Sequence, residues 1–187
     1  MPADNDLHKM TIEELGQLFP VIISEPSDKW ASYYQTESQM ILDKFSKSEI
    51  ERIDHIGSTA IPRLRAKPVI DILLQVSGHT DLQRIIDIFQ SLDYYYTKQP
   101  DNPPPHMMFV KGYSINGYKG QAYHVHVRYK GDWDELYFRD YLITHRIAAK
   151  GYEKLKLDLS GKFKNDREAY TKAKTAFISK VNKLARR

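Results

Sequence analysis

The sequence predicts an α+β protein: a mixed β-sheet packed against helices, followed by a helical C-terminal region. Strand-like apolar runs fill the middle of the chain, and apolar residues at helical spacing fill its last third. No repeat, low-complexity tract or linker divides it. With 187 residues, 41% hydrophobic and 28% charged, the chain is long enough for one domain with its own core.

The expected elements are helices over 11–19, 29–47 and 81–92, strands over 21–24, 52–56, 69–76, 107–113 and 122–129, a loop over 99–105, and helices from 135 onward. Thr11 and Glu14 have the spacing of a capping box before the first helix, and Pro20 ends it. Trp30 belongs to the apolar stripe of the second helix, so we interpret it as a packing residue. We divide the chain into an N-terminal extension, 1–28, and a main domain, 29–187.

The middle of the chain carries the strands. The run 69–76 is apolar on both faces except for one acid, Asp71, which predicts a central buried strand. Proline excludes regular structure from 99–105. Asn116–Gly117 and Gly120, between the last two strands, indicate a hairpin.

The last third of the chain carries two amphipathic helices. Apolar residues repeat at a spacing of three and four from Phe138 to Leu159, and again from Tyr170 to Leu184. Gly161 and Asn165–Asp166 separate the two stripes.

Composition excludes several classes of protein. There is no cysteine, which removes disulfide frameworks, thiol nucleophiles and cysteine-ligated zinc. No stretch approaches the roughly 18 apolar residues of a membrane span, and Met1–Asp4 lacks the pattern of a signal peptide. We therefore expect a cytoplasmic protein with no membrane partner.

The net charge of +4 is unevenly distributed. Residues 162–187 carry nine basic and two acidic side chains, whereas residues 1–161 carry 19 basic and 22 acidic ones. Because the basic excess lies on a helix with an apolar stripe, we expect its lysines on a solvated face. This argues against a nucleic-acid partner. Oligomeric state is not predicted.

Asp71 is the first candidate functional residue, because an isolated buried carboxylate either neutralises or binds a cation. It is either a member of a metal or phosphate site or a group bonded to nearby backbone. Gly57, Ser58 and Thr59 form a small-residue turn after a strand, where glycine lets a ligand approach the backbone. Ser58 or Thr59 can offer a hydroxyl group or cap a following helix, whose N-terminus attracts phosphate. Most turns of this composition connect two elements and bind no ligand. Lys67 precedes the Asp71 strand and is placed to neutralise phosphate, although a lone lysine usually faces solvent.

His124 and His126 are two residues apart on an expected strand, so they share one face, with Val125 and Val127 facing the core. Two imidazoles on one face suit metal ligation or acid–base chemistry. The alternative is an exposed hairpin face with incidental histidines.

His55 and Arg139–Asp140 are further polar residues in apolar surroundings. Neighbours on a helix are about 100° apart, so we expect Arg139 and Asp140 to serve different partners.

At these residues the chain resembles the GrpB family. The run His55–Pro62, continued by Ala66–Ile72, resembles its signature, and later runs match its pattern in order. These later runs are His124–Val127, Phe138–Leu142, Tyr152 and Leu155–Lys156. The resemblance extends from about Trp30 to the C-terminus.

The resemblance implies a fold of the nucleotidyltransferase superfamily and a nucleotide or other phosphorylated small molecule as partner. Carried over, Gly57 and Ser58 would form the phosphate turn, and Asp71 would be a ligand of a divalent cation, Mg²⁺ or Mn²⁺ or alternatively Zn²⁺. From the residues themselves we add Thr59, Lys67 and Arg139 as phosphate-binding residues. We add His124 and His126 to Asp71 as catalytic and metal-binding residues.

The chain also departs from the superfamily pattern. Leu73 stands where a second carboxylate is usual, and a third is not evident. One acid is a poor Mg²⁺ site, whereas Asp71 with two histidines suits zinc or a transition metal. Arg63 stands where the family commonly has glycine.

Three functions follow as alternatives. The first is a nucleotidyltransferase-like enzyme. The second is a non-catalytic module that binds a partner or assists folding, as thought for GrpB domains fused to dephospho-CoA kinase. The third is a metal-dependent hydrolase built on Asp71 and the two histidines, although Arg128 occupies the position where a third alternating histidine would stand.

Overall fold

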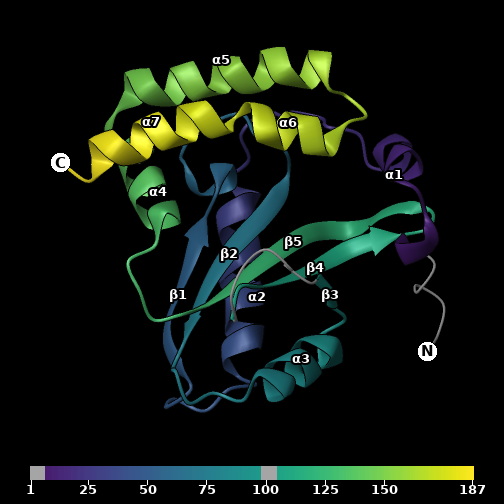
Figure 1. Cartoon of the computed structure of the whole chain (residues 1–187), viewed down its shortest axis with the longest axis vertical. Helices are drawn as coiled ribbons and strands as arrows, with labels where there is room; N and C mark the ends of the chain where they lie inside the picture. The colour runs from purple at the N-terminus through teal and green to yellow at the C-terminus, as the bar shows by residue number, and fades with distance from the viewer. Residues whose placement is uncertain (1–6, 98–104) are drawn as a thin grey trace.

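The computed structural model describes residues 7–97 and 105–187. Its centre is a five-stranded sheet in the order β1-β2-β5-β4-β3 (Figure 1). The strands are β1 (Ile50–Ile56), β2 (Val69–Val76), β3 (Tyr95–Thr97), β4 (Met107–Ser114) and β5 (Gly117–Tyr129). The helices are α1 (Ile12–Leu18), α2 (Lys29–Leu42), α3 (Leu82–Ser91), α4 (Asp134–Thr144), α5 (Arg146–Lys162), α6 (Arg167–Ala173) and α7 (Thr175–Ala185), with 3-10 turns η1 (Leu7–Lys9) and η2 (Ser58–Ala60).

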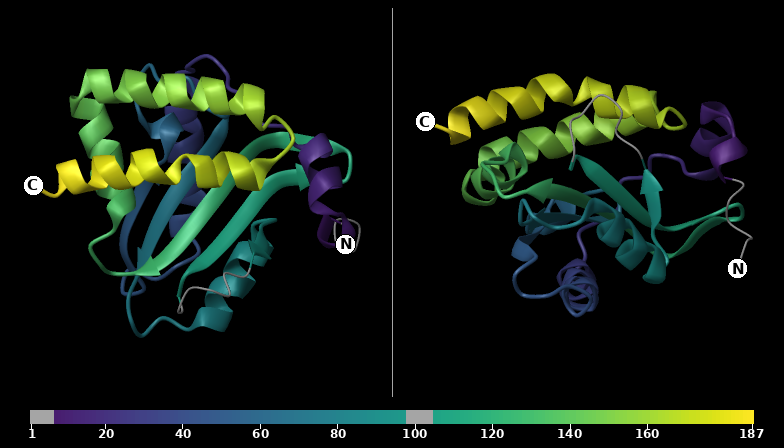
Figure 2. Two further views of the ribbon diagram at one scale, coloured as in Figure 1. Left: turned by 45° about the horizontal axis from the view of Figure 1, so that its top comes forward. Right: turned by 60° about the horizontal axis from the view of Figure 1, so that its bottom comes forward.

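The sheet lies between two helical layers, which confirms the predicted α+β class. Helices α2 and α3 cover one face, and α4 to α7 lie over the other (Figure 2). The main core lies under α2 and α3, where Ile72, Phe89 and Val125 are fully buried. Trp30 is buried in the same core, as predicted. No helix in the described ranges is long and apolar enough to cross a membrane.

Strand β2 is central because it is apolar on both faces. It pairs antiparallel with β1 and parallel with β5. Every β2 residue except Asp71 is buried. The parallel register places Asp71 opposite His124 and Leu73 opposite His126, and neighbours across a ladder point to the same face. This pairing brings the three candidate residues together.

Some expected elements have different bounds in the structure. Residues 21–24 form only an isolated bridge at Ser24 with Ala66, because Val21 pairs its backbone N–H with Lys164 rather than with a strand. The second helix ends at Leu42 rather than 47. The predicted loop over 99–105 lies outside the described residues except for Pro105.

The C-terminal part contains four helices where the sequence indicated two. His145 leaves helical geometry, with φ −113° and ψ 81°, and thereby separates α4 from α5. Its ring stacks on Tyr141 with a centroid distance of 3.8 Å. Lys174 separates α6 from α7. Helical periodicity continues across both breaks, so the apolar stripes alone did not reveal them.

Arg63 has a φ of 60°, in the left-handed region that favours glycine. This explains physically why the resemblance expects glycine there. Arginine at this position carries a backbone cost of about 1–2 kcal/mol.

We predict that Phe89→Ala lowers the free energy of unfolding by about 3–5 kcal/mol, because it removes a buried ring from the core. Phe89 is fully buried and stacks on Phe109 at a centroid distance of 4.2 Å. Urea denaturation measures the change. The matched control is Ile147→Ala, since Ile147 is 91% exposed and should change stability by less than about 0.5 kcal/mol. Equal losses in the two variants would contradict this assignment of the core.

Candidate functional site

A cavity of about 680 Å³ lies between the sheet and the helical layer of α4 to α7. Figure 2 shows α6 and α7 crossing above this face of the sheet. Six of the residues selected from the sequence line the cavity: Gly57, Ser58, Lys67, Asp71, His124 and His126. Four basic residues also line it, Lys67, Lys156, Arg167 and Lys174, and we call it the cationic cavity. The acidic residues Asp134 and Glu135 of α4 line it as well.

Gly57 and Asp71 are packed against each other at the floor of this cavity. Gly57 follows β1 with φ 69°, a conformation that favours glycine. A Cβ atom at position 57 would collide with the Asp71 carboxylate, and Oδ2 would be its nearest neighbour. Glycine is therefore required here both for its backbone conformation and for the space that the carboxylate occupies.

Two imidazoles face the other oxygen of Asp71. His124 Nδ1 lies 3.4 Å and His126 Nε2 4.0 Å from Oδ1. Burial opposes ionisation of Asp71, but the hydrogen bonds from His124 and His126 outweigh it and hold the pKa of the carboxyl well below its ordinary value. Asp71 is therefore an ionised carboxylate that faces both rings and lies nearer to His124.

His124 links Asp71 to Tyr113. Burial lowers the pKa of His124, so its imidazole is neutral near pH 7. Facing a carboxylate, Nδ1 carries the proton, and Nε2 accepts a hydrogen bond from the Tyr113 hydroxyl at 2.7 Å. Burial also raises the pKa of Tyr113 to about 12, which keeps this hydroxyl a donor.

The four basic side chains of the cavity come from separate segments of the chain. Lys67 precedes β2, Lys156 lies on α5, Arg167 starts α6, and Lys174 lies between α6 and α7. Within the described ranges, none of the four forms a salt bridge. They have other partners: Lys156 Nζ donates to the Arg65 carbonyl, and the charged ends of Lys156, Arg167 and Lys174 lie over aromatic rings.

Burial and mutual repulsion change the protonation of these groups. Burial, together with the charges of Arg167 and Lys174, lowers the pKa of Lys67 to about 7. Burial and the charge of Lys174 likewise lower the pKa of Lys156 to about 7. Burial also lowers the pKa of Lys174. Clustered cations of this kind gain strongly from an anion that neutralises them.

Two predicted phosphate-binding residues do not line the cavity. Thr59 is buried and donates its hydroxyl to the Val69 carbonyl at 3.0 Å. Arg139 donates to Asp54 at 3.2 Å and to the carbonyl of His55 at 2.9 Å. Both side chains hold the backbone around the Gly57 turn.

We expected Arg139 and Asp140 to serve different partners, and this is wrong. Arg139 Nε donates to Asp140 Oδ1 at 2.7 Å, so the two side chains pair with each other. The long guanidinium side chain reaches across the 100° that separates adjacent helix positions.

His55 lies under the turn rather than in the cavity. Its ring stacks on Tyr34 at a centroid distance of 4.8 Å, and Nε2 pairs with the Thr59 hydroxyl at 3.0 Å. Burial lowers the pKa of His55 to about 4. The residue is therefore a neutral packing group at pH 7.

Sequence reasoning missed Lys156, Arg167 and Lys174. The expectation that the C-terminal basic residues face solvent holds for Lys172, which is exposed, but is wrong for Lys174. What separates the buried lysines from the exposed one is their position in the helical repeat of the sequence. Lys174 stands four residues after Tyr170 and Lys156 four after Tyr152, so both continue a buried stripe.

The cavity residues do not fit a metal centre. Asp71 is a single carboxylate beside two imidazoles, whereas Mg²⁺ prefers oxygen ligands. Among the residues that the structure describes, no group of three or more histidine, aspartate or glutamate side chains is arranged to hold a metal ion. Tyr113 also pairs with the outer nitrogen of His124. The predicted metal therefore stays a prediction from the resemblance, and we derive no chemistry through it.

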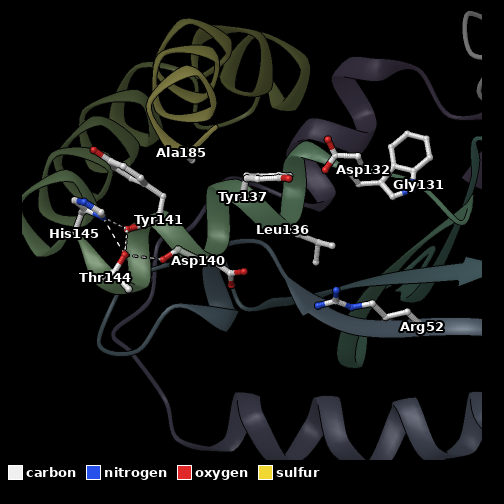
Figure 3. A pocket seen from close by; sticks show the side chains of 11 residues that line it. Arg52, Gly131, Asp132, Leu136, Tyr137, Asp140, Tyr141, Thr144, His145 and Ala185 are labelled. Atoms are coloured by element: carbon white, nitrogen blue, oxygen red, sulfur yellow. Dashed lines mark hydrogen bonds between the residues drawn. The ribbon is translucent and has the colours of Figure 1, made fainter. Parts of the chain in front are cut away.

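A second cavity, of about 500 Å³, lies along α4 (Figure 3). Its polar groups already have partners: His145 Nδ1 pairs with Thr144 at 2.9 Å, and Arg52 donates to Asp54 at 2.7 Å. Asp140, which the sequence analysis singled out, lines it and pairs with Arg139. None of the residues proposed for catalysis or for phosphate or metal binding lines it, and we assign no function to it.

Fold and site together define an α+β protein with a cationic cavity on one face of a mixed sheet. The fold is similar to the crystal structure of conserved protein GrpB from Enterococcus faecalis. The TM-score is 0.71 and the identity 28%, over 88% of this chain and 96% of that one.

The family model described as GrpB protein matches residues 20–184, so the chain belongs to the GrpB family. UPF0157 protein PA4798 of Pseudomonas aeruginosa is 35% identical over 162 residues, 86% of this chain. This chain spans 65% of that relative's length. Glutamate-rich protein GrpB of Alkalihalophilus pseudofirmus is 31% identical over 166 residues, 86% of this chain and 93% of that protein.

We predict that Gly57→Ala destabilises the protein by about 2 kcal/mol or more, because it combines a strained φ with a collision at the Asp71 carboxylate. Chemical denaturation measures the loss, and NMR of the His124 and His126 rings reports the displaced carboxylate. The control is Gly161→Ala on α5, where an added Cβ meets no atom within 4 Å. Unchanged imidazole resonances in Gly57→Ala would contradict the proposed packing.

Proposed function

We propose that the cationic cavity binds a phosphorylated small molecule, with nucleotides as the class that the family resemblance implies. The observation that carries this proposal is the set of four basic side chains around one space. Two of them, Lys67 and Lys156, have a pKa of about 7 because of burial. A bound phosphate would restore their charged form and make charge-assisted hydrogen bonds, each about 1.5–3 kcal/mol.

The turn beside Asp71 supports the same proposal. Gly57 and Ser58 line the cavity, so backbone and hydroxyl groups are available to phosphate oxygens. Lys67 lies on the next segment of the chain and lines the same space. This retains Gly57, Ser58 and Lys67 as proposed phosphate-binding residues and adds Lys156, Arg167 and Lys174.

For chemistry on the bound molecule, we propose an acid–base role for His124 and His126. Oδ1 of Asp71 lies 3.4 Å from His124 and 4.0 Å from His126, and a nearby carboxylate commonly orients a catalytic imidazole. Asp71 acts through the histidines, because Oδ2 is covered by Gly57. Asp71→Asn should then reduce any turnover without abolishing phosphate binding.

One observation favours the non-catalytic alternative, in which the domain binds its ligand or a protein partner without turnover. Leu73 occupies the position of the usual second carboxylate and is fully buried. That position therefore supplies no metal ligand. Release of pyrophosphate from nucleoside triphosphates separates the alternatives: turnover supports the enzyme, and tight binding without turnover supports the binding module.

We predict that Lys174→Met weakens binding of ATP and of inorganic phosphate at least about tenfold, because it removes one charge-assisted contact. The matched control is Lys172→Met, two residues earlier and exposed to solvent. Isothermal titration calorimetry at constant salt, with and without Mg²⁺, measures both. Equal affinities for the two variants, or no binding by the wild type, would refute the proposed site.

We predict that sulfate binds more weakly as the pH rises from about 6 to about 9. Sulfate keeps its charge over this range, whereas Lys67 and Lys156, each with a pKa of about 7, lose their protons. Affinity is therefore highest below pH 7 and is lost above it. Thermal stabilisation by sulfate measures the effect, and Lys67→Met should flatten the pH profile. A profile that is flat in the wild type would contradict the role of these lysines.

A further inference from the structure

A second, apolar space adjoins the cationic cavity. It has a volume of about 290 Å³ and lies between α1 and the outer strands of the sheet. Met108, His124 and Arg167 line both spaces, so the two share a wall. The side chains that line only this space are Leu7, Leu15, Phe19, Tyr95, Thr97, Val110 and Tyr113; we call it the apolar pocket.

The shared wall carries the charged and imidazole groups, and these also line the cationic cavity. Elsewhere the polar groups of the lining are the hydroxyls of Tyr95, Thr97 and Tyr113. His124 pairs with Asp71 on one side and with the Tyr113 hydroxyl on the other. The guanidinium of Arg167 lies over the Tyr113 and Phe19 rings at 5.4 and 6.0 Å. The rest of the pocket offers mainly aliphatic and aromatic surface, which favours an apolar group over a polar one.

We infer that the ligand is a phosphate ester with an apolar organic group. Its phosphate lies in the cationic cavity and its alkyl or aryl group enters the apolar pocket past Met108, His124 and Arg167. This inference rests on the proposed phosphate binding, and among phosphorylated molecules it selects apolar esters in place of nucleotides. A cavity of about 150 Å³ is enough to hold benzene in a protein interior, so 290 Å³ accommodates a phenyl or a hexyl group.

Arg167 is the residue that joins the two spaces. Its charged end belongs to the set of cations that surrounds the cationic cavity, while its plane rests on the aromatic wall of the apolar pocket. A ligand that contacts both spaces therefore passes beside this side chain. Arginine suits this position because its guanidinium binds phosphate and stacks on aromatic rings.

The test compares inorganic phosphate, ethyl phosphate, hexyl phosphate and phenyl phosphate by isothermal titration calorimetry on the full chain. Each methylene that enters an apolar site strengthens binding about three- to fourfold. We expect hexyl phosphate to bind at least about tenfold more tightly than ethyl phosphate. AMP, with a polar sugar between phosphate and base, should bind more weakly than phenyl phosphate.

Leu15→Trp fills the apolar pocket from a partly exposed position on α1 and should remove the gain from the longer chain. Leu15→Met is the matched control and should keep it. Val110→Phe, from the opposite wall, is a second filling variant in case Leu15→Trp disturbs α1. Unchanged affinity for inorganic phosphate shows that the cationic cavity is intact in each variant.

The outcomes separate the two proposals. If neither inorganic phosphate nor any ester binds, the proposed function fails, and this inference fails with it. If phosphate binds but chain length has no effect, only the inference is overturned. The same holds if the gain persists in both filling variants, or if AMP binds more tightly than phenyl phosphate. A gain that is lost in a filling variant and kept in Leu15→Met supports the inference.

Discussion

The position of the Asp71 carboxylate is the constraint on which the site depends. It is the one acid on a central strand, and the parallel pairing of β2 with β5 places it opposite His124. One oxygen faces two imidazoles, and the other packs on a glycine that has no room for a Cβ. A charge in this position is tolerated because it is only partly buried and two imidazoles face it. The strand pairing of the sheet therefore determines where these side chains of the site lie.

The helical layer completes the site from the other side. Lys156, Arg167 and Lys174 approach the sheet from α5, from the start of α6 and from the junction of α6 with α7. Burying like charges costs free energy, and burial lowers the pKa of Lys156 and of Lys174 for this reason. An anion bound in the cavity, as we propose, would offset part of that cost. This is the strongest physical reason for regarding the cavity as a binding site.

Membership of the GrpB family establishes the fold, but it does not establish the chemistry of the site. The family match covers residues 20–184, and the Enterococcus faecalis structure shares the fold. The position two residues after Asp71, by contrast, is a fully buried leucine. Nucleotidyl transfer with two metal ions needs several carboxylates. Phosphate binding needs only the cations, the turn and the space that the structure does supply.

The sequence by itself determined the α+β class, the central strand and the shared face of His124 and His126, because strand and helix periodicities are local properties. It also identified Gly57, Ser58, Lys67 and Asp71, which one cavity brings together. Only the tertiary structure decided that Lys174 faces the site while Lys172 faces solvent, since this depends on which side of the helix meets the sheet. It likewise placed Thr59 and Arg139 in support of the Gly57 turn. These placements depend on contacts between segments far apart in the chain, and a local sequence pattern does not encode such contacts.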